Sequence, residues 1–104
     1  MTILYDQLRM FCLTRFHEDW QQDSASRAEV VDDFVSTENP VLVETVISDL
    51  RSLLAEGLTE DELYDTMLRE YSLSFDPYKH EISMDEWLRG LLNELLAAVG
   101  REDG

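Results

Sequence analysis

The sequence predicts an all-α protein, a compact single-domain bundle of about five helices. Apolar residues recur at the three- and four-residue spacing of a buried helix face in several successive segments. Three of these segments follow a Ser or Thr with Glu three positions later, the capping-box pattern that begins a helix. Only four Gly and two Pro interrupt the 104 residues, and no segment sustains the apolar–polar alternation of a half-buried strand.

The first helix is expected from Thr2 to about Phe16. Its apolar residues lie on one stripe that is widened at both sides. They are Ile3, Leu4, Leu8, Met10, Phe11, Cys12 and Leu13. The single cysteine lies within this stripe, so an internal disulfide is excluded and a small buried thiol is expected.

The second helix follows the capping box at residues 26–29. The third begins at Asn39 and Pro40, because Asn is a strong N-cap and Pro at the first helical position has no N–H to lose. It is expected to run to Glu56, with Gly57 just past its end. The inward-facing residues of these two helices are Val30, Val31, Phe34, Val35, Val43, Val46, Ile47, Leu50, Leu53 and Leu54.

The fourth and fifth helices follow the capping boxes at residues 59–62 and 83–86. Between them, residues 72–82 show no consistent period and read as a turn around Pro77. The fifth helix is expected to end at Gly100, which leaves residues 1–100 as one domain and 101–104 as a short polar tail. The apolar residues of the two helices are Leu63, Met67, Leu68, Trp87, Leu88, Leu91, Leu92, Leu95, Leu96 and Val99, with Tyr64 and Tyr71 beside the fourth-helix stripe.

The charge of the chain indicates what kind of partner it binds. Eight Lys and Arg against 23 Asp and Glu give a formal net charge of -15. Long-range repulsion therefore opposes direct binding to nucleic acid or to an anionic membrane, and a cationic partner is expected. The N-terminus lacks a secretory pattern and no apolar run is long enough to span a membrane, so we expect a cytoplasmic protein.

The residues give little support to catalysis, metal binding or a cofactor. Two His and one Cys exclude a four-ligand structural zinc site of the Cys and His type. A nucleophile motif, a Gly-rich phosphate loop and an EF-hand calcium pattern are all missing from the sequence. The enzymatic alternative is a small metal-dependent hydrolase that uses His17, Asp19 and His80, although these residues have no recognisable spacing.

A run of aromatic and acidic residues in the fourth helix and the following turn is the candidate binding surface. Aromatic side chains provide anchors at protein interfaces, and carboxylates raise the association rate with a basic partner. The candidate contact residues are Glu60, Asp61, Glu62, Tyr64, Asp65, Tyr71, Phe75, Asp76 and Tyr78.

Several stretches together resemble the bacterial contact-dependent growth inhibition (CDI) system immunity proteins. They are residues 15–20, 29–31 with Phe34, 53–63 and the pair Trp87-Leu88, and the resemblance extends from about Leu4 to Leu95. The Phe-His-x-Asp-Trp stretch is the most specific part. We expect the residues of this stretch and the late tryptophan to be structural. They are Phe16, His17, Asp19, Trp20 and Trp87.

The resemblance implies a small cytoplasmic protein that binds and neutralises the C-terminal toxin domain of a contact-delivered effector. Such toxins are often nucleases with basic clefts, which a strongly acidic inhibitor would complement. We therefore expect a stoichiometric inhibitor that is not an enzyme, is a monomer and needs no cofactor. The alternative binding function is an acidic adaptor or nucleic-acid mimic for an unrelated basic host protein. The gene context would distinguish this alternative from a toxin inhibitor.

Overall fold

The computed structural model describes residues 5–16, 26–71, 73, 77 and 81–103, with side chains described up to residue 100. Within these ranges the chain is helical and contains no strand. The elements are α1 (Asp6–Arg15), α3 (Arg27–Thr37), α4 (Pro40–Ala55), α5 (Glu60–Asp65), a π-helical turn η1 (Thr66–Glu70) that continues α5, and α6 (Met84–Asp103). The predicted all-α bundle of about five helices is confirmed.

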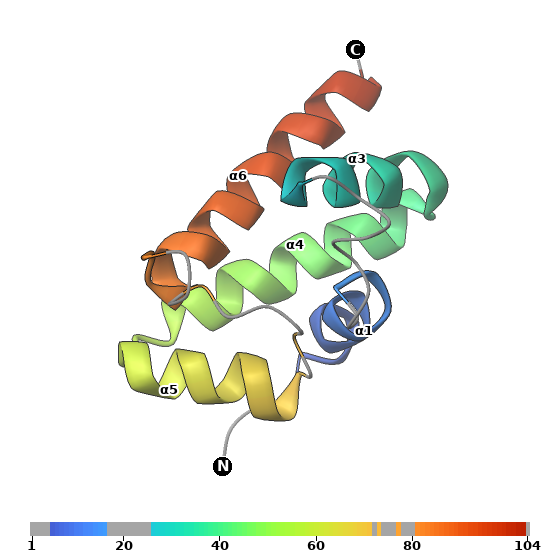
Figure 1. The fold of residues 1–104 in the computed structure, drawn as a ribbon. Helices are drawn as coiled ribbons and strands as arrows, with labels where there is room; N and C mark the ends of the chain where they lie inside the picture. The colour runs from blue at the N-terminus through green and yellow to red at the C-terminus, as the bar shows by residue number, and fades with distance from the viewer. Residues whose placement is uncertain (1–4, 17–25, 72, 74–76, 78–80, 104) are drawn as a thin grey trace.

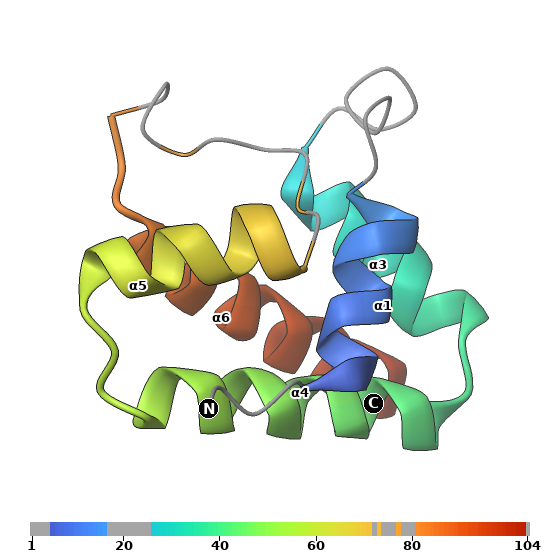
Figure 2. The ribbon, with the colours of Figure 1, turned by 90° about the horizontal axis from the view of Figure 1, so that it is seen from below.

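The helix α4 packs against α1 and against α6 (Figure 1). The helix α3 packs mainly on α6, and α5 lies against α6 near the N-terminal end of that helix. Seen from below, α1 rises steeply from α4, and α5 lies to the left of α1 on the same side of α4 (Figure 2). Every helix therefore contributes one face to a shared core.

Local signals place most of the helix ends where the sequence predicts them. Ser26 Oγ accepts a hydrogen bond from the Glu29 N–H, and Asn39 Oδ1 accepts one from the Val41 N–H. Gly57, just after α4, has a φ of 73°, a backbone conformation that favours glycine. These predicted boundaries are confirmed.

Two boundaries differ from the sequence prediction. Tyr5 has a non-helical backbone conformation, so α1 begins at Asp6 and not at Thr2. The helix α6 continues through Gly100 to Asp103, into the segment expected to be a polar tail. A glycine destabilises a helix interior by about 1 kcal/mol relative to alanine, which is too little to stop a long helix that is already formed.

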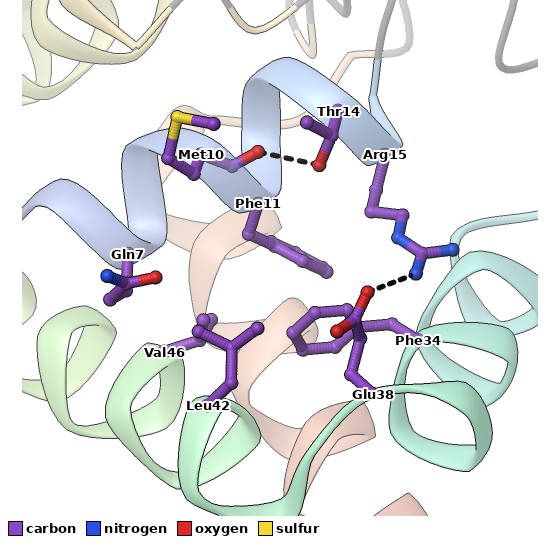
Figure 3. A pocket seen from close by; sticks show the side chains of 9 residues that line it. All are labelled: Gln7, Met10, Phe11, Thr14, Arg15, Phe34, Glu38, Leu42 and Val46. Atoms are coloured by element: carbon purple, nitrogen blue, oxygen red, sulfur yellow. Dashed lines mark hydrogen bonds and ion pairs between the residues drawn. The ribbon is translucent and has the colours of Figure 1, made fainter.

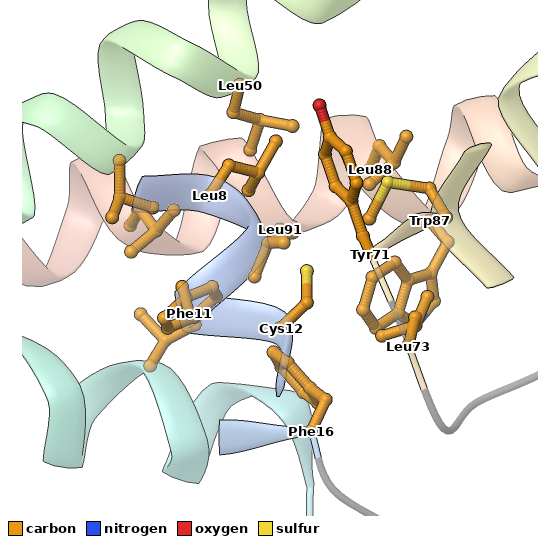
Figure 4. Close-up of a cluster of buried hydrophobic side chains, with 14 of the residues drawn as sticks. Leu8, Phe11, Cys12, Phe16, Leu50, Tyr71, Leu73, Trp87, Leu88 and Leu91 are labelled. Carbon is orange, nitrogen blue, oxygen red and sulfur yellow. The ribbon is translucent and has the colours of Figure 1, made fainter. Parts of the chain in front are cut away.

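The core contains most residues of the predicted stripes (Figure 4), and Ile3 and Leu4 of the first stripe lie outside the described residues. Cys12 is fully buried, and this burial raises the pKa of its thiol to about 12, as expected for a small buried thiol. Three residues expected on buried faces are exposed: Met10, Leu13 and Leu96. On α1 the buried face is the narrow stripe of Leu8, Phe11 and Cys12, and residues that flank it reach the surface.

Candidate functional site

Glu60, at the start of α5, holds the N-terminus of α6. Its Oε2 accepts a hydrogen bond from the Met84 N–H at 2.6 Å, and its Oε1 accepts one from the Asp85 N–H at 3.0 Å. The first N–H groups of a helix have no partner inside the helix, and the positive end of the helix dipole attracts a carboxylate. The structure therefore gives Glu60, a predicted toxin contact, a bond that joins the beginnings of two helices.

The predicted capping box closes the first turn of α5. The Thr59 N–H donates to Glu62 Oε1 at 3.0 Å, and the Glu62 N–H donates to Thr59 Oγ1 at 3.2 Å. The hydrogen bond from the Thr59 backbone N–H, followed by the Thr59 side chain, lowers the pKa of Glu62 from its ordinary value, so its carboxylate stays charged. Glu62 is exposed, so it combines a local structural role with a negative charge at the surface.

The first turn of α6 lies beside that of α5 and adds carboxylates to it. The Asp65 side chain is 63% exposed, and its Oδ1 lies 3.8 Å from Arg69 Nε. Asp85 Oδ2 forms an ion pair with Arg89 Nε at 2.9 Å. Ion pairs this exposed contribute little to stability. The exposed and half-exposed carboxylates of the two helices, which we call the acidic face, are Asp61, Glu62, Asp65, Asp85 and Glu86.

Tyr71, another predicted contact residue, is fully buried and does not belong to this surface (Figure 4). Its hydroxyl accepts a hydrogen bond from the Tyr5 N–H at 3.1 Å, and burial raises its pKa. Tyr71 follows the π-helical turn η1, and its N–H donates to Thr66 O, five residues back. Such a turn takes more residues than an α-helical turn, so Leu63, Met67 and Tyr71, four apart, stay on the buried face.

The other predicted residues fall into two groups. Tyr64 is half-buried and packs against the core, and Phe16 and Trp87 meet edge to face inside it, with their ring centroids 5.4 Å apart. The remaining predicted residues lie outside the described part of the chain: His17, Asp19, Trp20, Phe75, Asp76 and Tyr78.

The carboxylates of the acidic face can accept hydrogen bonds and attract positive charge. Among the residues described, no group of three or more His, Cys, Asp or Glu is placed to hold a metal ion. The histidines of the hydrolase alternative are outside those residues. The length and hydropathy of the described helices do not meet what a membrane-spanning helix requires.

Sequence reasoning missed the bond between Glu60 and α6, because the two partners are 24 residues apart. The Ser83 and Glu86 pattern correctly indicated the local cap, in which Ser83 Oγ accepts from the Glu86 N–H at 3.1 Å. No local pattern shows that a carboxylate from another helix reaches the same helix end.

Comparisons with known proteins agree on the relationship of this chain. A chain in the crystal structure of a CdiA-CT/CdiI complex from Y. kristensenii 33638 matches with a TM-score of 0.80 and 23% sequence identity, over 88% of this chain and 97% of that chain. At this identity the likeness shows a shared fold. The comparison with curated proteins gave no match. The model of the family described as CdiI immunity protein matches residues 4–95. Because this match spans most of the chain, the protein belongs to the CdiI immunity protein family.

Proposed function

We propose that this immunity protein neutralises a cognate CdiA C-terminal toxin domain by binding it one to one, without catalysis, in the cytoplasm. The observation that carries the proposal is the family match over residues 4–95. The neighbour of the same fold comes from a CdiA-CT/CdiI complex, which supports a toxin domain as the partner.

The toxin domain that fits best is a nuclease with a basic cleft. The net charge of -15 supports this choice, because complementary fields raise the rate of association between proteins. The acidic face supplies carboxylates on two helices whose first turns are joined by Glu60. In this arrangement, carboxylates occupy positions on the toxin that would otherwise bind phosphate groups.

Co-expression with the C-terminal region encoded by the adjacent upstream gene tests the function. We expect growth rescue and a complex that co-purifies, and the association to slow as the salt concentration rises. Toxicity without rescue or binding would contradict the proposal and would favour the acidic adaptor instead.

Charge reversal tests the role of the acidic face. The variants Asp61→Lys and Asp65→Lys should each slow association with immobilised toxin domain by several-fold at low salt, and the double variant by about tenfold or more. Glu62 is left unchanged because it caps α5. Glu44→Lys is the matched control, since Glu44 is an exposed acid on α4 and its reversal changes the net charge equally. An equal effect of Glu44→Lys would show that total charge, and not this face, sets the rate.

A further inference from the structure

A cleft of about 250 Å³ lies between α1, α3 and α4 (Figure 3), whereas the acidic face is formed by α5 and the start of α6. Its inner wall is apolar and contains the buried residues Phe11, Phe34 and Val46 together with the half-buried Leu42. Met10 lies at its opening and is 43% exposed. An exposed methionine beside an apolar hollow is typical of surfaces that adapt to a partner, because its side chain is flexible and polarisable.

A network of charges adjoins this cleft: Arg15 and Glu38 line it, and Asp33 lies just outside the lining as a partner of Arg15. Arg15 donates to Asp33 Oδ2 at 2.7 Å and to Glu38 Oε1 at 2.9 Å, and its guanidinium lies 5.5 Å from the centre of the Phe34 ring. Two carboxylates around one guanidinium give this rim a net negative charge. Asp33 is 62% and Glu38 is 36% exposed, so both can also accept hydrogen bonds from a partner. The contacts fix the rim in place, which lowers the entropy lost on binding.

We propose that this cleft receives an apolar side chain of the toxin domain that is flanked by a lysine or arginine. The apolar wall would bury the anchor, and the exposed carboxylates of the rim would pair with the adjacent cation. A buried anchor at the centre and a polar rim around it are the usual arrangement of a protein interface. The inference rests on the proposed function and adds a second contact region to the acidic face.

A second groove, between α4 and α6, provides the comparison. It is lined by aliphatic side chains that include Leu96, which is 39% exposed, and by Glu44 and Arg51. Glu44 and Arg51 are both exposed and form no ion pair within the described part of the chain, whereas Arg15 at the first cleft is paired with two carboxylates. The described lining of the second groove therefore presents an unpaired cation and no excess of negative charge. Leu96 and Met10 are similarly exposed and both lie within a helix, but the surroundings of Leu96 are less suited to a basic partner.

Competition for the toxin domain tests the inference. Tagged toxin domain is co-expressed with equal amounts of the wild-type chain and one variant, and the two bound forms are quantified after purification. Met10→Lys should reduce the captured share at least tenfold, because it places a cation at the opening for a cationic partner. Leu96→Lys, with the same change of charge, and Met10→Leu, which keeps the apolar character, should both stay within twofold of wild type.

Equal capture of Met10→Lys and Leu96→Lys would overturn the inference. If the acidic-face variants still slowed association in that case, the proposed function would stand alone, whereas failure of the wild-type chain to bind would overturn both. Methyl NMR of the methionines gives an independent readout. The Met10 methyl signal should shift on adding toxin domain, while those of the fully buried Met67 and Met84 should stay nearly constant.

Discussion

The carboxylate of Glu60 accepts a 2.6 Å hydrogen bond from the backbone N–H of Met84 and so ties the start of α5 to the start of α6. The residue is acidic and lies in an acidic segment, yet its role in the fold is to satisfy a helix end. The same bond brings two acidic first turns together, with Asp61 and Glu62 on one side and Asp85 and Glu86 on the other. Repulsion within the acidic face is thus opposed by a hydrogen bond that itself uses a carboxylate.

Removal of this carboxylate should destabilise the fold. Glu60→Ala loses two charge-assisted hydrogen bonds at a helix N-terminus, and we expect the free energy of unfolding to fall by about 1–2 kcal/mol. Glu60→Gln keeps one acceptor oxygen, so its free energy of unfolding should lie between those of the wild type and Glu60→Ala. Urea denaturation measures the effect, with Asp61→Ala as the control because Asp61 is exposed on the same turn. Equal stabilities of Glu60→Ala and Asp61→Ala would contradict this role.

Gly90 makes room for the side chain of Arg27 between α3 and α6. The guanidinium forms two hydrogen bonds with Glu94, at 2.8 and 3.0 Å, and one with Trp87 O at 2.9 Å. A Cβ atom at Gly90 would lie 2.5 Å from Arg27 Nη2. Only glycine at this position leaves the guanidinium where it is.

A double-mutant cycle should reveal this dependence. In the Arg27→Ala background, Gly90→Ala should stabilise the protein by about 0.5–1 kcal/mol, because alanine favours the helix. With Arg27 present it should instead destabilise by about 1 kcal/mol, since the guanidinium must move away from its partners. Thermal or urea unfolding of the four proteins measures the coupling. Additive effects of the two substitutions would mean that the Arg27 side chain can move away from Gly90 without a loss of stability.

Features set by neighbouring residues could be predicted from the sequence. The N-caps Ser26, Asn39 and Thr59 act within three residues, so the sequence around them contains the whole signal. The apolar stripes were equally predictable, because a helix repeats its faces at a fixed spacing.

Features that join distant segments could not be predicted. Asp49 of α4 accepts a hydrogen bond from the Leu8 N–H in the first turn of α1, as Glu60 does for α6, and both bonds depend on how helices pack. The π-helical turn is also set by packing, because it keeps Tyr71 in the core at the expense of regular α-helical bonding. For the candidate site, the acidic residues were visible in the sequence, but which of them are engaged in the fold was not.

Cys12 should be unreactive in the folded protein. Burial raises its thiol pKa to about 12, so almost no thiolate forms at neutral pH, and the side chain is fully buried. Reaction with a thiol reagent such as DTNB should therefore require unfolding, and its rate should rise in proportion to the unfolded fraction as urea is added. Cys12→Ser should remove the reaction completely. Rapid labelling under native conditions would show that this part of α1 opens on its own.

The hydrogen bond between Tyr5 and Glu56 should make stability fall at high pH. The Tyr5 hydroxyl donates to Glu56 Oε2 at 2.7 Å, and this bond, together with partial burial, raises its pKa from 10.0 to about 12. The folded state holds the proton more tightly than the unfolded state, so the stabilisation is fully present below pH 10 and is lost between pH 10 and about 12. Wild type should exceed Tyr5→Phe in stability at pH 8, and the difference should shrink towards pH 12. Glu56→Gln should give a Tyr5 pKa closer to the ordinary value, measured by tyrosine absorbance, and a pH-independent difference would contradict the assignment.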